Sequence, residues 1–503
     1  MYTASIAMEY ILEVVQRFWP FLTAAAGLAF SIIASAHVII YKRDSRAAVA
    51  WVGLIWLSPF VGALLYLLLG INRVRRRAAG RRRNDTAGFA PPADSYECGP
   101  SELAASLPGQ YSHLAEMAEV TGRLTKLPLV RGNSVHPLFD GGEAYPAMLN
   151  AIAQATQSIT LLSFLFDNDR LGRQFVDALG AAVKRGVEVR VLIDAAGARS
   201  SVPPVTGRLR SLGVRTELFM SGVLAGRFPR INPRNYPYLN LRNHRKIMVA
   251  DGRLAFTGGM NIREAHLLAD DPARGTKDVH FQLEGPVVQQ LQATFAADWV
   301  FTTGEVLEGE LWFPAPQPNS GEVFARAIPD GPDQDMDRMA MSFHGALAVA
   351  HHSVRIVTPY FLPDRSLISA LSTCALRGVR VEIVLPAENN HNVVAWAAMA
   401  QMWQVLEWGC HVRMTAPPFD HSKLLVVDDA LCVIGSSNWD PRSLRLCFEL
   451  GVECYDTELA ARLNARIDQQ LVGAHSLTKE QVDARSLPAK LRDGICRLGA
   501  PYL

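Results

Sequence analysis

Hydrophobic residues are concentrated near the start of the chain, in two long stretches separated by a short charged loop. Residues 19–41 and 47–71 contain no Asp, Glu, Lys or Arg, and the loop between them, KRDSR at 42–46, carries three basic residues. About 20 apolar residues are enough for a helix to cross a bilayer. The pattern predicts a transmembrane hairpin of two helices, the second kinked at Pro59. A cleaved signal peptide is the weaker alternative, because two such stretches occur in tandem.

A different pattern, in which strands and helices alternate, occurs twice in the rest of the chain. SITLLSFLFDND at 158–169 parallels SVRIVTPYFLPD at 353–364, and ALGAAVKRGVEVRVLI at 178–193 parallels LSTCALRGVRVEIVL at 371–385. In each copy an apolar strand leads through a polar turn to a helix that ends at Arg-Gly, and then to a Val-rich strand. The alternation predicts an α/β sandwich, and the repeat predicts two related halves.

These patterns divide the chain into four regions. We predict a membrane region at 1–77, a basic and polar linker at 78–127, and the two α/β halves at 128–318 and 319–503. The linker prediction depends on Gly, Pro and Asn in that stretch, including the run AGFAPPADSYECGP. The last segment, 487–503, is mildly amphipathic, and two interpretations stay open for it: packing on the protein surface, or lying on a membrane.

Charge is balanced overall but uneven along the chain. Lys plus Arg number 50 against 48 for Asp plus Glu, so no global charge marks a nucleic-acid binder. Seven Arg lie within 73–83, directly after the second apolar stretch, a position that favours anionic lipid headgroups. Together with Arg17 they predict that this side of the hairpin faces the cytoplasm with the following region, although the 42–46 loop is basic too. Seven scattered Cys without CxxC or Cys/His spacing predict reduced thiols and no zinc site.

The chemistry is indicated by a motif that each half contains once. It consists of His-x-Lys, an Asp after four further residues, a Gly seven residues past the Asp and an Asn ten past it. Agreement at five positions, 177 residues apart, favours a shared function over two structural hairpins with incidental histidines. The first copy is His244, Lys246, Asp251, Gly258 and Asn261, and the second is His421, Lys423, Asp428, Gly435 and Asn438.

Each motif is predicted to form a β-hairpin that ends at a turn. Residues i and i+2 of a strand share a face, so the His and Lys of one motif project together. Two such hairpins facing each other would gather two imidazoles, two ammoniums and two amides around one phosphate. One His can then attack phosphorus while the other protonates the leaving oxygen. The near-symmetry of the halves leaves open which His is the nucleophile.

These motifs, together with NLRNHRKI, AFTGGMN, TPYFLPD, FDHSK and IGSSNWDPRSL, resemble the phospholipase D superfamily and, within it, the bacterial cardiolipin synthases. The resemblance implies two phospholipase D-like α/β/α sandwich halves related by a pseudo-twofold. It also implies a phosphatidyltransferase that joins two phosphatidylglycerol molecules into cardiolipin and releases glycerol. His244 would be the nucleophile, forming a phosphohistidine, and His421 the general acid and then base.

The resemblance also implies roles for the neighbouring residues. Asp278 and Glu449, about thirty residues past their respective histidines, would orient them, and Asp251 and Asp428 would mainly hold the turns. Ser436 would add a phosphate contact that is missing at Gly259. Lys and Asn side chains would do the electrostatic work of a metal, so neither metal nor cofactor is expected. The residues that would hold the phosphate are Lys246, Lys423, Asn261 and Asn438.

The expected partners are phosphatidylglycerol and anionic membrane lipid, with no nucleic acid, and the expected location is the bacterial inner membrane. Three alternatives stay open. Water can intercept the intermediate, which gives a phospholipase D. A nuclease of the same superfamily would leave the apolar stretches without a role, and an idle membrane scaffold would leave the intact motifs unexplained. The oligomeric state is not predicted.

Overall fold

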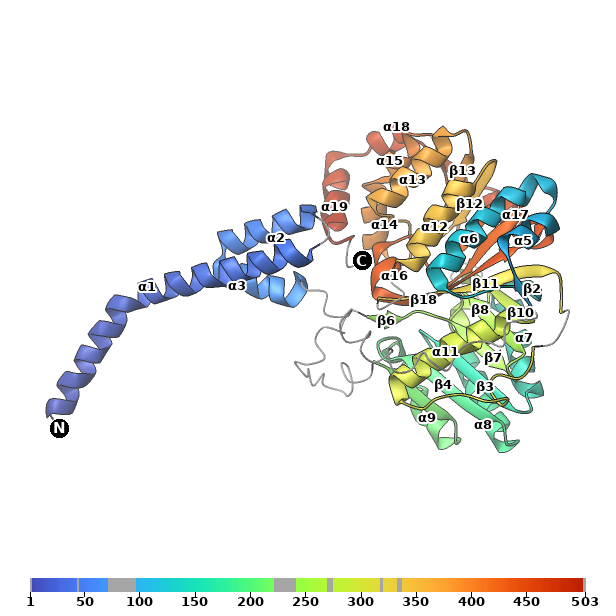
Figure 1. Cartoon of the computed structure of the whole chain (residues 1–503), viewed down its shortest axis with the longest axis horizontal. Coiled ribbons are helices and arrows are strands. Elements are labelled where there is room, and N and C mark those ends of the chain that lie inside the picture. The colour runs from blue at the N-terminus through green and yellow to red at the C-terminus, as the bar shows by residue number, and fades with distance from the viewer. Residues whose placement is uncertain are drawn as a thin grey trace. The chain divides into compact units, whose positions relative to one another are not determined.

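The chain forms two compact units, Met1–Arg75 and Arg76–Leu503. Figure 1 shows the chain coloured from its N-terminus to its C-terminus. The computed structural model describes residues 2–42, 45–70, 96–220, 241–268, 275–316, 320–332 and 337–500.

The N-terminal unit begins with one long helix, α1 (Tyr2–Tyr41). Its part from Arg17 to Tyr41 has 25 residues and a mean hydropathy of 1.9. Among the described residues, this is the one helix that is long and apolar enough to cross a membrane. It coincides with the first predicted span.

The second predicted span, 47–71, is not one helix, which corrects the prediction of two membrane-crossing helices. It is divided into α2 (Ser45–Leu57), α3 (Pro59–Leu65) and a π-helical turn, η1 (Tyr66–Gly70). The division falls at Pro59, which has no backbone N–H to donate and clashes with the preceding turn. Each piece is shorter than the roughly 20 residues that a crossing needs.

Helix α3 folds back along α2. A Cβ added to Gly62 would lie 2.5 Å from the carbonyl oxygen of Leu54, whereas residues eight apart in a straight helix are separated by about 12 Å. The rings of Trp51 and Tyr66 are 5.4 Å apart. Tyr66 also reaches α1, where its hydroxyl lies 2.8 Å from Nδ1 of His37. The end of η1 therefore returns to the level at which α1 ends.

In the second unit, two sheets repeat one order of strands. In the first half the order is β5-β4-β3-β7-β8-β10-β2, and in the second it is β14-β13-β12-β16-β17-β18-β11. In each order the first three strands pair in parallel, and all later neighbours pair antiparallel. The first set is β2 (Leu129–Phe139), β3 (Ser158–Ser163), β4 (Glu188–Asp194), β5 (Arg215–Phe219), β7 (Ile247–Ala250), β8 (Leu254–Gly258) and β10 (Val279–Glu284). The second set is β11 (Val323–Asp330), β12 (Ser353–Val357), β13 (Arg380–Pro386), β14 (His411–Thr415), β16 (Leu424–Val427), β17 (Leu431–Gly435) and β18 (Cys447–Tyr455).

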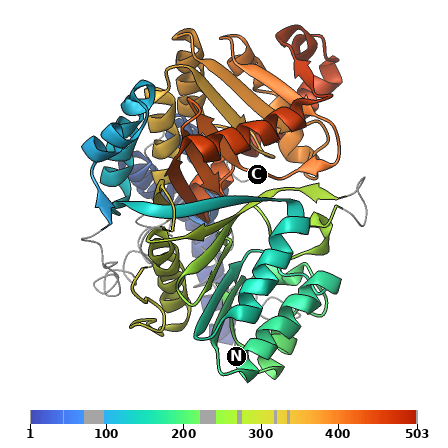
Figure 2. The same cartoon turned by 90° about the vertical axis from the view of Figure 1, so that its right-hand side faces the viewer.

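Strands β2 and β11 pair with each other and join the two sheets. Figure 2 shows β2, in teal, crossing between the green first half and the orange and red second half. The shorter strands are β1 (Glu97–Cys98), β6 (Arg242–Asn243), β9 (Thr276–Lys277), β15 (Phe419–Asp420) and β19 (His475–Leu477).

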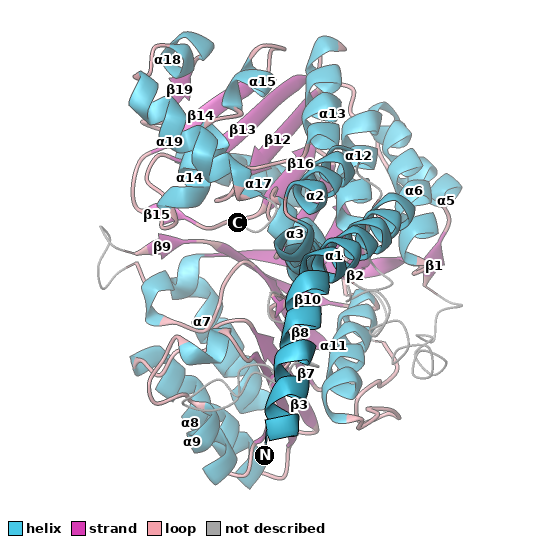
Figure 3. Cartoon of the chain, turned by 90° about the vertical axis from the view of Figure 1, so that its left-hand side faces the viewer, coloured by secondary structure: helices cyan, strands magenta, loops and turns pink. Residues whose placement is uncertain are grey.

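Helices cover both faces of each sheet, as Figure 3 shows. Alternate side chains of a strand point to opposite faces. On β3, Leu161 enters the core under α7 and α8, whereas the hydroxyl of Thr160 donates to Gln292 of α11. On β12, Ile356 enters the core under α12 and α13, whereas Arg355 bonds to Asn464 of α17. Helices therefore pack on both faces of each sheet, and the mixed α/β fold that was predicted is confirmed.

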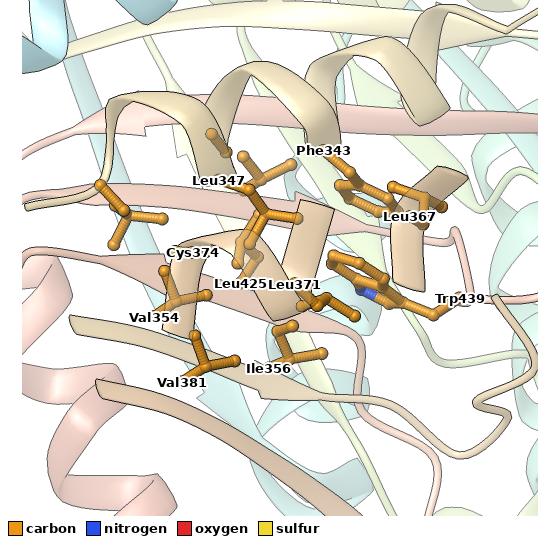
Figure 4. Close-up of a cluster of buried hydrophobic side chains, with 14 of the residues drawn as sticks. Phe343, Leu347, Val354, Ile356, Leu367, Leu371, Cys374, Val381, Leu425 and Trp439 are labelled. Carbon is orange, nitrogen blue, oxygen red and sulfur yellow. The ribbon is translucent and has the colours of Figure 1, made fainter. Parts of the chain in front are cut away.

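Figure 4 shows the core of the second half, where helices α12 and α13 pack on β12 and β13. Phe343 and Trp439 stack there with ring centroids 4.3 Å apart. The principal helices are α7 (Asp140–Gln154), α8 (Arg170–Lys184), α9 (Thr206–Ser211), α11 (Val287–Thr303), α12 (Arg338–Val349), α13 (Arg365–Leu376), α14 (Asn392–Met399), α15 (Met402–Leu406), α16 (Pro441–Leu446), α17 (Thr457–Leu471), α18 (Lys479–Asp483) and α19 (Leu487–Leu498). Two 3₁₀ turns, η4 (Gly197–Arg199) and η6 (Glu264–His266), lie in the first half.

The stretch predicted as a linker, 78–127, is folded wherever the structure describes it, from residue 96 on. It contains β1, α5 (Pro100–Ser106), η3 (Gly109–Leu114) and α6 (Ala115–Thr125). Leu103, Leu114 and Met117 are fully buried in the core of the second half. These few apolar side chains stand among many polar ones, which is why composition indicated a linker. Residues 78–95 and the Arg run at 73–83 lie outside the described residues.

Candidate active site

Two short strands carry the motif histidines across the junction between the halves. Strand β6 runs parallel to the start of β18, and β15 runs parallel to β9. The backbone N–H of His244 then donates to the carbonyl of Phe448 at 2.9 Å, and that of His421 donates to the carbonyl of Lys277 at 2.8 Å. Each motif is thus docked by its backbone on the opposite half. This docking brings both histidines to one place.

The two histidines face carboxylates of the opposite half. Nδ1 of His244 lies 3.1 Å from Oε1 of Glu449, and Nδ1 of His421 lies 2.8 Å from Oδ2 of Asp278. Asp278 and Glu449, the two predicted acids, are thus each within hydrogen-bond distance of an imidazole, and their orienting role stays a prediction. The prediction that each acid orients the histidine of its own half is wrong, because the docking of β6 and β15 exchanges the partners.

The two histidines are accessible to a substrate, whereas the two carboxylates are not. The side chains of His244 and His421 are 14% and 11% exposed, and the side chains of Glu449 and Asp278 are 0% exposed. With Nδ1 directed at a carboxylate, Nε2 is the nitrogen that each histidine can present to a substrate. The carboxylates can act only through the imidazoles.

The motif lysines lie beside the histidines and are buried. The ammonium of Lys246 donates to the carbonyl of His244 at 2.6 Å, and that of Lys423 donates to the carbonyl of His421. Burial lowers the pKa of Lys246 to about 7 and that of Lys423 to about 8. A bound anion would favour the protonated form of both. The site is therefore suited to a phosphate, whose charge the two lysines would offset.

The two imidazole–carboxylate pairs differ in their electrostatics. Burial lowers the pKa of His244, and burial together with Lys423 and Lys246 holds the pKa of His421 well below its usual range. Burial raises the pKa of Asp278. Burial also acts to raise the pKa of Glu449, but His244 and Lys246 hold it below its ordinary value. Glu449 is thus the more firmly ionised of the two acids.

Ser436 lies beside the site in a role other than the one predicted. Its hydroxyl donates to Oε2 of Glu449 at 2.5 Å and accepts from the N–H of Leu450 at 3.1 Å. It therefore holds the acid that orients His244, and its hydroxyl is not directed at a substrate phosphate. The matching position, Gly259, has no room for a side chain, because an added Cβ would lie 2.1 Å from Oδ1 of Asp278.

The two motif asparagines are buried close to the site. Oδ1 of Asn261 accepts from the backbone N–H of Leu165 at 3.1 Å. Nδ2 of Asn438 donates to the hydroxyl of Ser443 at 3.1 Å. Each amide is thereby tied to a neighbouring segment of its own half. Their contact with phosphate stays a prediction.

The motif acids Asp251 and Asp428 are structural. They follow β7 and β16, at the strand ends opposite the histidines. Asp251 accepts from three consecutive backbone N–H groups, and so does Asp428, as their predicted turn-holding role requires. The donors are Thr156, Gln157 and Ser158 for the first and His351, His352 and Ser353 for the second.

Three residues that the motif did not single out also shape the site. Arg245 is fully buried, where it pairs with Asp298 at 2.7 Å and donates to the carbonyl of Glu449 at 2.8 Å. The ring of Phe164 lies 5.1 Å from that of His244, and the ring of Tyr360 lies 6.2 Å from that of His421. Both aromatics come from the repeated turns after β3 and β12. They are not at equivalent positions of the repeat, so the sequence signal for them was limited to an aromatic residue in each of these turns.

Among the described residues, no group of three or more His, Cys, Asp or Glu side chains is placed to hold a metal ion. The expectation of a metal-free reaction stays a prediction.

Comparison with known proteins identifies the family. A family model described as cardiolipin synthase, PLD-like domain, matches residues 148–299 and 344–471, which contain both motifs. The chain belongs to this phospholipase D-like cardiolipin synthase family. A second family model, described as phospholipase D-nuclease N-terminal, matches residues 29–70.

Curated relatives in the family align over nearly the whole chain. A cardiolipin synthase of Staphylococcus aureus strain Mu50 is 30% identical, with 94% of each chain covered. The major cardiolipin synthase of Bacillus subtilis strain 168 is 29% identical, with 93% of this chain and 96% of the relative covered. Among solved structures, a phosphatidylserine synthase of Haemophilus influenzae Rd KW20 superposes with a TM-score of 0.58 at 15% identity. That superposition covers 77% of this chain and 100% of the other, and it supports the fold alone.

Proposed function

We propose that the protein is a cardiolipin synthase, which transfers the phosphatidyl group of one phosphatidylglycerol to the free glycerol hydroxyl of another. The observation that carries the proposal is the crossed arrangement of His244 with Glu449 and His421 with Asp278. It supplies one nucleophile and one acid–base group to a site that also holds two lysines. The two curated relatives described above are named cardiolipin synthases.

In the first step, Nε2 of His244 attacks the phosphorus of phosphatidylglycerol. The bond from phosphorus to the glycerol oxygen breaks, and glycerol leaves as His421 gives its proton to that oxygen. The bound phosphate favours the protonated form of His421, whose pKa burial and the two lysines otherwise hold low. Lys246 and Lys423 offset the negative charge that develops on the phosphoryl oxygens. His244 is the better candidate for the nucleophile, because firmly ionised Glu449 suits an imidazole that becomes positively charged.

In the second step, His421 removes a proton from the hydroxyl of a second phosphatidylglycerol. The resulting oxygen attacks phosphorus, the bond to His244 breaks, and cardiolipin leaves. The aromatic walls of Phe164 and Tyr360 limit the access of water, which would otherwise yield phosphatidic acid. Asn261 and Asn438 would steady the phosphate in both steps.

We propose that regions 128–318 and 319–503 are the two phospholipase D-like halves and are related by a pseudo-twofold axis. The support is the strand order that they share and the matched docking of β6 on β18 and of β15 on β9.

We propose that the catalytic unit faces the cytoplasm of a bacterium, at its inner membrane. If α1 alone crosses, the folded-back α2 and α3 leave the basic loop 42–46 and the arginines at 73–83 on one side of the bilayer. Basic segments prefer the cytoplasmic side. The N-terminus would then lie on the opposite side, in place of the shared side expected for two spans.

Incubating the purified full-length protein with phosphatidylglycerol tests the proposal. Cardiolipin and glycerol are expected. Phosphatidic acid and glycerol would indicate a phospholipase D, and no turnover would indicate an idle scaffold. With substrate labelled in its phosphate, His244→Ala should lose the covalent phosphoprotein that the unchanged protein forms. Asp251→Asn is the matched control, because its carboxylate lies at the opposite strand end.

A further inference from the structure

The C-terminal helix α19 exposes a stripe of large apolar side chains. Leu487, Leu491, Ile495 and Leu498 are between 59% and 80% exposed. At about 100° per residue, they fall within an arc of about 80° on the helix surface. Large apolar patches on a protein surface mark interaction sites.

The opposite face of α19 packs on the protein. The guanidinium of Arg492 lies 4.3 Å from the ring centroid of Trp396 on α14. Asp493, the one acid of the helix, is fully buried and is paired with Arg485 at 2.6 Å and with Arg492 at 2.8 Å. The helix is therefore firmly seated, and no negative charge of its own lies beside the stripe.

Exposed basic residues, Lys490 and Arg497, border one edge of the stripe. Toward the other edge lies Arg492, whose charge is paired with Asp493. An apolar stripe bordered by basic residues is the pattern of a helix that lies in the plane of a membrane interface. The cations would meet anionic headgroups, while the apolar side chains enter the upper acyl region.

The stripe also lies close to the catalytic centre. Helix α14, which contacts α19, begins directly after His391, and the ring of His391 is 5.7 Å from that of Tyr360. The Tyr360 ring in turn contacts that of His421 at 6.2 Å. Figure 3 shows α14 and α19 side by side next to β15, which carries the chain to His421.

We propose that the exposed face of α19 docks on the surface of an anionic lipid bilayer and thereby holds the mouth of the active site at the headgroups. The basic flanks and the absence of a paired acid on that face favour lipid over a second copy of the chain. The docking itself does not depend on the proposed activity. Only its consequence, delivery of bilayer lipid to His421, rests on the proposed function.

Depth-dependent quenching tests the docking directly. The full-length protein carrying Leu491→Cys and Cys496→Ser is labelled with a fluorophore and reconstituted into vesicles that contain phosphatidylglycerol. The other six cysteines are buried. Nitroxide-bearing lipids should quench this label several-fold more than a label at Val472→Cys, another highly exposed position, in the same Cys496→Ser background.

Equal quenching at the two positions would overturn the proposal. So would energy transfer between labels at position 491 without lipid quenching, which would indicate a second copy of the chain. Repeating the measurement with His421→Ala separates docking from catalysis. The quenching should persist in this variant even if the proposed activity is wrong.

A second experiment measures the consequence for catalysis. In full-length proteoliposomes, the pair Leu491→Glu and Ile495→Glu should reduce turnover of bilayer phosphatidylglycerol on the order of tenfold, because two carboxylates must approach anionic headgroups. Turnover of short-chain phosphatidylglycerol dissolved as monomers should stay unchanged, which also shows that the variant is folded. The pair Leu376→Glu and Val472→Glu adds the same charge at other exposed positions and should affect neither rate. An equal loss with both substrates would contradict the proposal.

Discussion

Ser436 and Gly259 occupy the same motif position but differ in how they contact the neighbouring carboxylate. Ser436 donates a hydrogen bond to Glu449, whereas at position 259 the carboxylate of Asp278 fills the space itself. A hydrogen bond to a carboxylate stabilises its ionised form. The difference between two side chains therefore makes one imidazole–carboxylate pair more polar than the other.

Replacing Ser436 with alanine should lower kcat by about tenfold, because a hydrogen bond to a charged group contributes about 1.5–3 kcal/mol. KM for phosphatidylglycerol should stay the same, since the hydroxyl is not directed at the substrate. Steady-state kinetics in mixed micelles checks both constants. A raised KM with unchanged kcat would instead favour the phosphate contact that the sequence implied. Gly259→Ala should be more damaging, because its Cβ displaces Asp278.

The lysines predict how substrate affinity depends on pH. Lys246, with a pKa of about 7, and Lys423, with a pKa of about 8, bind an anion in their protonated forms. The protonated fraction falls as pH rises through these values, so affinity is lost on the alkaline side and kept on the acid side. KM for phosphatidylglycerol, measured from pH 6 to 9.5, should therefore rise above about pH 8. A KM that stays flat while kcat alone changes would contradict this assignment.

At the scale of elements, the broken second stretch of the N-terminal unit is the basis of the proposed membrane topology. A Pro after Ser58 interrupts the helix, and the absence of a side chain at Gly62 lets α3 approach α2. A larger residue at position 62 would meet the backbone of Leu54 and Ile55. Two positions thus divide a stretch long enough to cross a bilayer into two short helices that fold back on each other.

Cysteine accessibility distinguishes the two topologies. In a Cys496→Ser background, a membrane-impermeant maleimide should label Ser45→Cys and Ala78→Cys from the same side of the membrane and Ala4→Cys from the opposite side. Labelling of intact spheroplasts reports cysteines on the outer side of the membrane, and labelling of inside-out vesicles reports those on the cytoplasmic side. If two helices cross instead, Ala4→Cys and Ala78→Cys will share a side and Ser45→Cys will lie on the other.

At the scale of the whole molecule, the exchange of carboxylates between the halves predicts which reaction step each acid substitution slows. With a phosphatidyl ester of p-nitrophenol, the leaving group needs no proton. Glu449→Gln should then abolish the burst of nitrophenol, because it disturbs His244, whereas Asp278→Asn should retain the burst and slow the second step. Rapid-mixing absorbance measurements give the burst amplitude. The reverse result would mean that His421 is the nucleophile or that each acid serves the histidine of its own half.

Much of this arrangement follows from local pattern. The i, i+2 spacing predicts that His244 and Lys246 project together, and the internal repeat predicts two α/β/α halves. In the structure both residues lie in the short segment between β6 and β7, and not within a strand. The exchange of acids between the histidines does not follow from the sequence. Strands β6 and β15 have two residues each, which is too short for a hydrophobic pattern that would predict the strands with which they pair. Pro59 predicted a kink, but the fold-back also depends on the close approach at Gly62. In α5, η3 and α6, a few buried apolar residues, such as Leu103, Leu114 and Met117, stand among polar ones, so composition did not reveal the folded structure of the predicted linker.

The exchanged acids have a consequence for the history of the chain. After a tandem duplication, one copy is ordinarily released to drift or to acquire a new role. Here a change in the surroundings of Asp278 alters the reactivity of a histidine in the other copy, and a change around Glu449 does the same in return. Selection therefore acts on both copies as one gene product, and neither can be lost while the reaction is retained.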